Sequence, residues 1–212
     1  MPGYQRTTDF HGQSLEEFDP DSSAGTVTQR GAWHLSAAVS GPPELHELLE
    51  CFVRTVDTSQ VTTLAVGFTG FDGPDAATPL LEAAECFPRL QALLLGDEQD
   101  FTSIRQTDLT PVLERFPLLE RLDVRGKHGL ELRPIHHAAL KILRFESCGL
   151  PSDVARAVSA SDLPGLEHLD LWLGVEDSEV DVADVADLAA ILSGERLPAL
   201  RSLGLENSAI QD

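Results

Sequence analysis

The stretch that decides the fold is LPGLEHLDLWLG, at residues 163–174. Its first nine residues follow the pattern Leu/Phe-Pro-x-Leu-x-x-Leu-x-Leu/Val. Three other segments repeat this pattern: FPRLQALLL at residues 87–95, FPLLERLDV at residues 116–124 and LPALRSLGL at residues 197–205. Chance alone would produce about 0.06 copies in a chain of this composition, so the four copies indicate a true internal repeat.

Two further segments carry the same apolar positions without the proline. They are QVTTLAV at residues 60–66 and HAALKILRFESCGL at residues 137–150. The six copies start at residues 61, 90, 119, 140, 166 and 200, so they are 29, 29, 21, 26 and 34 residues apart. Each copy ends in alternating apolar residues, which predicts a short strand. The looser segment AWHLSA predicts an earlier strand near residues 33–38.

Helix signals lie between the predicted strands. Residues 44–56 carry apolar side chains at helical spacing, and residues 184–193 indicate another helix. Three helices are predicted to begin at a capping residue or proline, namely at Thr78-Pro79, Thr110-Pro111 and Pro151-Ser152. The 21-residue spacing leaves no room for a helix. Strand and helix in alternation predict an α/β leucine-rich-repeat solenoid of about six to seven repeats, with a curved parallel sheet on the concave side and helices on the convex side.

The repeats resemble those of bacterial leucine-rich-repeat proteins with ribonuclease-inhibitor-like repeats. More narrowly, the chain resembles an uncharacterised bacterial family that shares the runs ELRP, FES-x-GLP, ASDLP-x-LEHL-x-LWLG and LP-x-LR-x-LGL-x-NS-x-I, found here at residues 131–134, 145–151, 160–174 and 197–210. The resemblance implies a repeat scaffold without an assigned activity, so it carries over no catalytic residue. Members of that family are longer, so we expect this chain to be a shortened form or to have its last strand edge covered.

We expect a single structural domain in two parts. Residues 1–57 form an N-terminal lead-in and capping region, and residues 58–212 hold the leucine-rich repeats. Within the first part, residues 1–25 are polar and contain Pro, Gly and Ser, which predicts a loose or capping segment.

Composition narrows the classes of partner. The chain has 212 residues with 15 Lys+Arg and 35 Asp+Glu, a formal net charge of −20. This charge argues against nucleic acid and against an anionic membrane surface, and no apolar run is long enough to span a bilayer. The N-terminus lacks an apolar signal segment. The chain has three cysteines, and in a chain without an export signal the simplest explanation is that they are reduced thiols. We therefore expect a cytoplasmic protein, and the scarcity of Lys and Asn favours a bacterial source.

The residues between the inward leucines predict the functional surface. They face the concave side of the sheet, and aligned copies place them in three ladders. The ladders are Thr63-Ala92-Arg121-Ile142-His168-Ser202, Ala65-Leu94-Asp123-Arg144-Asp170-Gly204 and Gly67-Gly96-Arg125-Glu146-Trp172-Glu206. Their N-terminal members are small or apolar, whereas charged and aromatic side chains gather towards the C-terminus.

We expect a protein or peptide partner on the C-terminal half of this surface. The candidate residues are Arg121, Asp123, Arg125, Arg144, Glu146, His168, Asp170, Trp172 and Glu206. Arg and Trp are the side chains in which interface energy concentrates. The alternative is a self-satisfied network of alternating charges, which is compatible with partner binding. Trp172 either contacts a partner or packs over the loop at residues 171–184.

The catalytic and metal patterns in the chain are incomplete. HELLE at residues 46–50 lacks the second histidine of a zinc protease, and the acids at residues 177–181 lack the Gly and Glu of a calcium loop. His136-His137 has no acidic or cysteine partner at useful spacing, and Cys148 is expected to point inward rather than act as a nucleophile. We therefore expect no enzyme activity, no metal and no cofactor.

The sequence thus predicts a non-enzymatic binding scaffold that recognises a protein or peptide on its concave leucine-rich-repeat surface. The alternative is an accessory protein that presents a peptide or small-molecule substrate to a bacterial biosynthetic enzyme. An enzyme that uses Asp123, Asp170 and His168 is a weaker hypothesis, because no nucleophile accompanies them. The open C-terminal repeat edge also allows self-association.

Overall fold

One row of parallel strands runs through the molecule. The structure is a computed structural model that describes residues 7–21, 31–36, 44–67, 75–97, 104–126, 128–174, 183–194 and 196–206. Within these residues, an eight-stranded sheet has the order β10-β9-β8-β7-β6-β5-β4-β3, and every neighbouring pair is parallel. Because neighbours in the sheet are also consecutive in the chain, each strand stacks on the one before it. This arrangement is α/β and compatible with a repeat solenoid.

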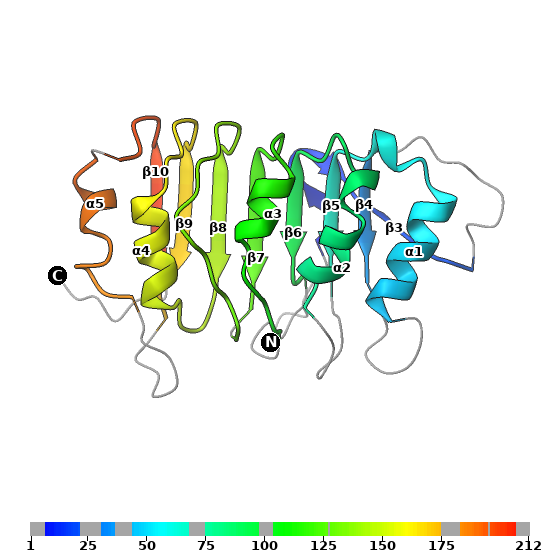
Figure 1. Cartoon of the computed structure of the whole chain (residues 1–212), viewed down its shortest axis with the longest axis horizontal. Helices are drawn as coiled ribbons and strands as arrows, with labels where there is room; N and C mark the ends of the chain where they lie inside the picture. The colour runs from blue at the N-terminus through cyan, green and yellow to red at the C-terminus, as the bar shows by residue number, and fades with distance from the viewer. Residues whose placement is uncertain are drawn as a thin grey trace.

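The helices and the short antiparallel hairpin lie on opposite faces of the sheet (Figure 1). The strands of the sheet are β3 (Glu16–Glu17), β4 (Ala32–Leu35), β5 (Thr63–Val66), β6 (Ala92–Leu95), β7 (Arg121–Arg125), β8 (Ile142–Glu146), β9 (His168–Trp172) and β10 (Ser202–Glu206). The hairpin consists of β1 (Asp9–Phe10) and β2 (Gln13–Ser14). The helical elements are α1 (Leu45–Thr55), η1 (Thr58–Gln60), α2 (Ala77–Glu82), η2 (Ala84–Cys86), α3 (Thr110–Arg115), α4 (Ser152–Ala160) and α5 (Ala189–Leu192).

All five predicted helices are present, and two of them have caps that differ from those expected. The helix predicted at residues 184–193 is limited to α5. The prediction that Thr78 and Thr110 act as caps is wrong, because both lie inside their helices. Asp75 Oδ1 accepts from the backbone N–H of Thr78 at 2.8 Å, and Asp108 Oδ1 accepts from that of Thr110 at 2.9 Å. In the described residues, no helix is long and apolar enough to cross a membrane.

The repeated leucines form one core between the sheet and the helices. In the first five copies, the three apolar positions are at most 2% exposed, as at Leu90, Leu93 and Leu95. In-register pairing places these positions side by side, with Leu143 opposite Leu169. The last copy differs, because its leucines are only partly buried. Inward leucines are therefore the common feature of the copies, whereas the number of repeats stays a prediction.

Aromatic side chains close the N-terminal end of the core. The Phe52 ring lies 5.0 Å from that of Phe18 and 5.3 Å from that of Trp33, in edge-to-face contacts. Phe18 follows β3, which adds an outer strand beside β4. Residues 16–18 therefore cover the first repeat at this end, and the division into residues 1–57 and 58–212 stays a prediction.

We expect Leu169→Ala to lower the free energy of unfolding by about 2–5 kcal/mol, because it removes a buried side chain from the middle of the stack. Leu169 is 1% exposed and pairs with Leu143 on one side and Leu203 on the other. Leu205→Ala, at the half-buried edge, is the matched control and should cost clearly less. Urea unfolding measures both, and equal losses would contradict a core that is tighter inside than at its edge.

Candidate functional site

The predicted ladders lie in register on the face of the sheet opposite the helices, which we term the open face. Asp123 pairs with Arg144 in the strand alignment, and Arg144 pairs with Asp170. Arg125 is opposite Glu146 in the same way. Neighbouring strands are about 4.8 Å apart, so side chains on this face can bond across the sheet. The charge alternation expected across β7, β8 and β9 is therefore present.

An unbroken chain of ion pairs crosses the open face from the end of β6 to β9. Asp97 Oδ1 lies 2.8 Å from Arg125 Nη1, and Arg125 Nε donates to Glu146 Oε2 at 2.7 Å. Glu146 Oε1 lies 3.0 Å from Arg144 Nη1, whose Nε lies 2.9 Å from Asp170 Oδ2. Each arginine thus holds two carboxylates. Pairs this close and partly buried hold their side chains in one arrangement.

Arg121 and Asp123 form a second, local pair. Arg121 Nε and Nη2 donate to the two carboxylate oxygens of Asp123 at 2.8 and 2.7 Å. The two residues lie two positions apart on β7, so their side chains share the open face. Asp123 is therefore paired with Arg121 on its own strand, whereas Arg144 forms ion pairs with Glu146 and Asp170.

Sequence reasoning missed the buried end of the network. Asp97 has a fully buried side chain and lies 3.1 Å from Nε2 of the buried His34. It also accepts from the backbone N–H of Thr7 at 3.2 Å and from its hydroxyl at 2.7 Å. The ladders stopped at Gly96, one residue before Asp97, and His34 belongs to the strand with the loosest pattern. The one sequence signal for Asp97 was its place as an acidic residue directly after Gly96, the glycine that follows the repeat strand.

Asp170 lies at the other, more exposed end of the network. Burial raises the pKa of its carboxyl, Arg144 opposes this shift, and the charges of Glu206 and Asp123 raise the pKa further. A Cβ on Gly204 would lie 2.7 Å from Asp170 Oδ1, so the absence of a side chain at position 204 makes room for this carboxylate. With Glu206 nearby, this end of the open face favours a positively charged group.

The Trp172 indole and the Arg144 guanidinium lie side by side. Arg144 Cζ is 5.9 Å from the ring centroid, within the range of a cation–π contact. Trp172 is half-buried, whereas His168 and Glu206 are exposed. The alternative packing of Trp172 over the loop at residues 171–184 concerns a segment largely outside the described residues. All nine predicted site residues lie on β7, β8, β9 or β10, and their contact with a partner stays a prediction.

The hairpin of β1 and β2 covers the N-terminal half of the open face. Phe10 is 4% exposed and packs on Ala65, Ala92 and Leu94, which belong to the first two ladders. Figure 1 shows this hairpin in dark blue behind β5 and β6, on the side away from the helices. The uncovered part of the open face therefore lies towards its C-terminal half, although Asp123 and Glu146 are buried there at 4% and 7% exposure.

The histidine patterns rejected from the sequence have structural partners. His136 Nδ1 lies 2.6 Å from Asp162 Oδ2, an acidic partner that is 26 residues away and that spacing in the sequence did not indicate. His137 is buried, its Nε2 lies 3.1 Å from the Phe116 carbonyl oxygen, and its Nδ1 accepts from the Leu140 N–H. Burial lowers the pKa of His137, which suits a neutral ring that bonds the turn.

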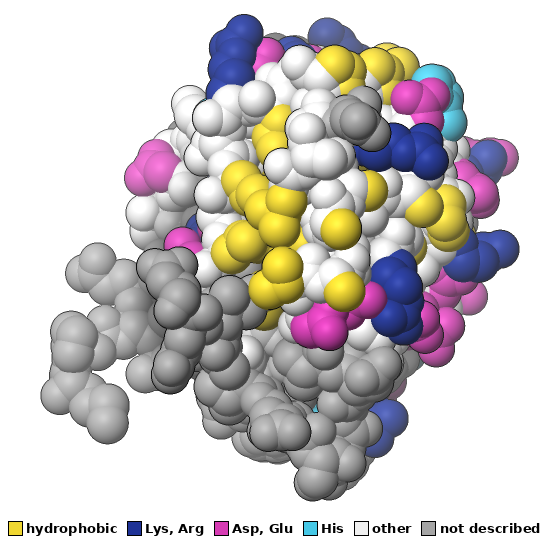
Figure 2. Space-filling view, turned by 90° about the vertical axis from the view of Figure 1, so that its left-hand side faces the viewer, with side chains coloured by type: hydrophobic (Ala, Val, Ile, Leu, Met, Phe, Trp, Pro, Cys, Tyr) yellow, Lys and Arg dark blue, Asp and Glu magenta, His cyan; other side chains and the backbone are white. Residues whose placement is uncertain are grey.

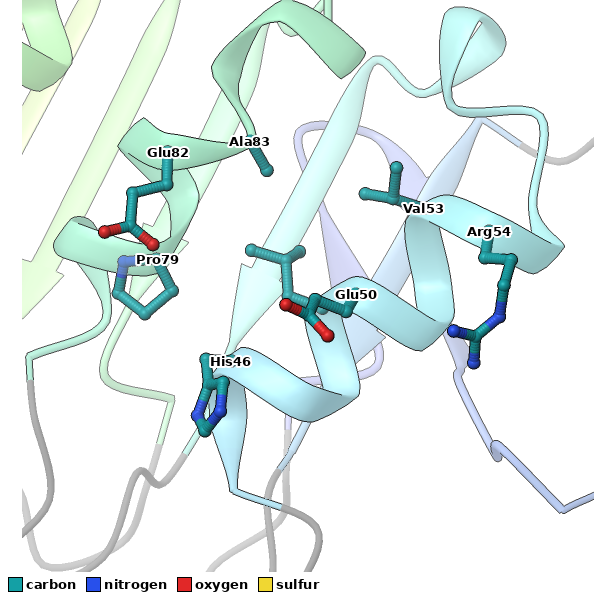
Figure 3. A pocket seen from close by; sticks show the side chains of 8 residues that line it. His46, Glu50, Val53, Arg54, Pro79, Glu82 and Ala83 are labelled. Atoms are coloured by element: carbon teal, nitrogen blue, oxygen red, sulfur yellow. The ribbon is translucent and has the colours of Figure 1, made fainter.

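A hollow of about 440 Å³ lies between α1 and α2 on the helical side (Figure 3). His46 and Glu50 of the HELLE segment line it together with Glu82. In the part of the chain that the structure describes, no group of three or more His, Cys, Asp or Glu residues is placed to hold a metal ion. The acids at residues 177–181 lie outside that part. Cys148 is only half-buried, whereas Ser147 is buried and its Oγ accepts from the Gly149 N–H.

Comparisons with other proteins find structures that are similar to this chain. A protein of Bacteroides fragilis, solved by a structural genomics consortium, superposes with a TM-score of 0.70 at 31% identity, over 80% of this chain and 51% of its own. Listeria monocytogenes InlP gives a TM-score of 0.46 at 16% identity, over 90% of this chain and 46% of its own. This chain thus spans about half the length of the structures it matches. No protein-family model matches the sequence, and no curated protein matches it significantly.

We expect Asp97→Ala to lower the free energy of unfolding by about 3–5 kcal/mol, because Arg125 and the Thr7 donors lose a fully buried carboxylate, although Arg125 keeps its bond to Glu146. The matched control is Glu85→Ala, which breaks the exposed pair of Glu85 with Arg115 and should cost less than about 1 kcal/mol. Denaturant unfolding at neutral pH compares the two. Similar losses would show that Asp97 does not hold the network together.

Proposed function

We propose that this chain is a non-enzymatic binding scaffold that recognises a protein or peptide on the C-terminal half of its open face. The observation that carries the proposal is the division of this face, since Phe10 of the hairpin packs on β5 and β6, while Arg144, Trp172, His168 and Glu206 on β8 to β10 are partly or fully exposed. We further propose that the scaffold is a curved leucine-rich-repeat solenoid of about six to seven repeats, of the bacterial ribonuclease-inhibitor-like kind. The repeat pattern and the sequential parallel sheet support this.

Ion pairs fix the candidate side chains in the unbound protein. Asp123 holds the Arg121 guanidinium through two bonds, and Glu146 and Asp170 hold that of Arg144 from two sides. Fixed side chains lose little conformational entropy on binding, so more of the contact energy becomes affinity. The Arg144 side chain is still 30% exposed and lies beside Trp172, which makes this pair the natural anchor.

The same bonding supports a binding role over a catalytic one. Asp123 and Asp170, the two acids of the hypothetical active site, are each paired with an arginine. These arginines hold both carboxylates in ion pairs within the surface network, which is the arrangement of an ordered binding surface. We therefore propose no enzyme activity, and no metal or cofactor has a role in the proposal.

We also propose a bacterial, cytoplasmic protein whose partner is neither nucleic acid nor a membrane. The net charge of −20 disfavours both surfaces. Cys51, Cys86 and Cys148 are all free thiols, as a reducing compartment would keep them.

The double variant Arg144→Ala/Trp172→Ala tests the proposed face. We expect it to weaken capture of a native partner by at least about tenfold, since it removes both anchors. The partly exposed ion pairs of Arg144 should contribute only about 1 kcal/mol to folding, so thermal unfolding should move little. Pull-down from a bacterial extract, followed by calorimetry on the captured protein, measures the effect.

The matched control for that experiment is Glu82→Ala/Glu114→Ala on the helical side, where both side chains are exposed. If the control abolishes binding and the double variant retains it, the partner binds the helical side of the sheet, which would contradict this proposal. Copurification of a modified peptide instead of a protein would favour the accessory role in biosynthesis.

We propose self-association at the C-terminal end as a second contact. Within the described residues, β10 pairs only with β9, so its outer edge is open. Leu200, Leu203 and Leu205 are partly buried there, and Leu192 is 50% exposed. Figure 2 shows hydrophobic side chains grouped at this end of the molecule. An open strand edge with apolar neighbours is a template for pairing with another strand.

We expect light scattering to show a dimer fraction that rises with protein concentration. Leu192→Glu should abolish it, because the carboxylate would be buried without a partner. Leu118→Glu is the matched control, since Leu118 is 51% exposed at the start of a different repeat. A wild-type chain that stays monomeric at every concentration tested would remove this contact from the proposal.

A further inference from the structure

We propose that the open face carries a site for an aromatic side chain, which Phe10 of the chain itself fills here and which an aromatic residue of a partner enters when the hairpin lifts. This inference rests on the proposed binding function and specifies the chemistry of the partner. The covered half of the open face thereby becomes part of the binding surface.

Three apolar side chains form the floor of this site. Ala65, Ala92 and Leu94 are at most 1% exposed, and Phe10 packs on them. The wall is the Arg121 guanidinium, whose Cζ lies 4.3 Å from the centroid of the Phe10 ring. A flat apolar floor with a cation over the ring favours an aromatic side chain over an aliphatic one of similar size.

The sheet, and not the hairpin, sets the shape of the site. Ala65 and Leu94 are opposite each other on β5 and β6, and Ala92 is opposite Arg121 on β7. The Arg121 guanidinium is held by both oxygens of Asp123, which is itself 4% exposed. Floor and wall therefore keep their positions when Phe10 leaves, so another aromatic ring finds a formed site.

The hairpin is attached more weakly than the segment that follows it. Thr7 bonds Asp97, and the Gln13 side-chain amide donates to the hydroxyls of Thr62 and Thr63, both at 3.1 Å. The next residues are anchored in the body of the protein, because β3 pairs with β4 and Phe18 is 3% exposed in the core. Small units with few contacts open at low free-energy cost. Residues 8–15 can therefore lift as a loop while Thr7 and Phe18 stay in place.

The hairpin also meets the candidate partner surface directly. Its tip is a tight turn in which His11 has φ +52° and Gly12 has φ +72°. Phe10, next to this tip, contacts the Arg121 guanidinium on β7, so the hairpin reaches the border of the charged half of the open face. A partner bound at Arg144 and extending towards β6 therefore reaches the hairpin first. Continuity between the two surfaces makes the partner's own chain the natural replacement for Phe10.

Titration of the full chain with synthetic peptides tests the site. The probe is a fluorescent peptide with the sequence of residues 7–17, carrying Phe, Leu or Ala at position 10. Phe10→Ala should bind the Phe peptide at least about tenfold more tightly than the wild type, whose site is filled for most of the time. The Leu peptide should bind more weakly and the Ala peptide should not bind. Asp9→Ala, an exposed change in the same hairpin, should behave as the wild type.

The inference would be overturned if Phe10→Ala and the wild type bound the Phe peptide with equal affinity. It would also be overturned if the affinity did not depend on residue 10 of the peptide. Adding Arg121→Gln to Phe10→Ala should remove the preference for Phe over Leu, because the cation above the ring is gone. A retained preference would count against the site as described.

Hydrogen exchange of the wild type gives a test that needs no variant. The Leu15 amide, bonded to the Thr8 carbonyl at 2.7 Å, should exchange at least about a hundredfold faster than the Leu64 amide of β5. Equal protection would show that the hairpin does not open separately. These peptide and exchange results are independent of the Arg144→Ala/Trp172→Ala pull-down, so the site and the proposed function can fail separately.

Discussion

Burial of the repeated leucines is the constraint on which the rest of the structure depends. One copy of the pattern has a single short strand and cannot bury its own leucines, so it needs a neighbour on each side. Strand pairing in register is the arrangement that lines Leu93 up with Leu122 and Leu143 with Leu169. The same register aligns the residues that alternate with them on the open face. The core therefore decides which surface side chains become neighbours.

The charge chain on the open face follows from this alignment, and its two ends differ. At the buried end, Asp97 has no exposed side-chain surface and joins His34, Arg125 and Thr7. At the other end, Asp170 and Arg144 keep 25% and 30% of their side chains exposed. A buried pair is costly to break, whereas an exposed pair is worth little to folding. One network is thus buried at one end and partly exposed at the other.

The N-terminal segment explains the uneven composition of the ladders. Their first members are small or apolar, which suggested a face without groups to orient a partner. Ala65, Ala92 and Leu94 instead form a floor beneath Phe10. Because the hairpin covers the weakly polar half of the face, apolar surface is buried there, while His168 and Glu206 stay exposed at the other end.

The sequence by itself determined strands β4 to β10, the helices, the inward leucines and the three ladders, because these features depend on local periodicity and on a repeat that aligns the copies. Sequence reasoning could not find the capping acids Asp75 and Asp108, the partner of His136, or the place of Asp97, since each depends on backbone geometry or on a residue far away in the chain. The hairpin shows the limit most clearly. Residues 7–15 carry no repeat, and the sites that hold Thr7, Phe10 and Gln13 exist only after β5, β6 and β7 have been brought together. Only the tertiary structure could therefore decide which half of the open face is covered.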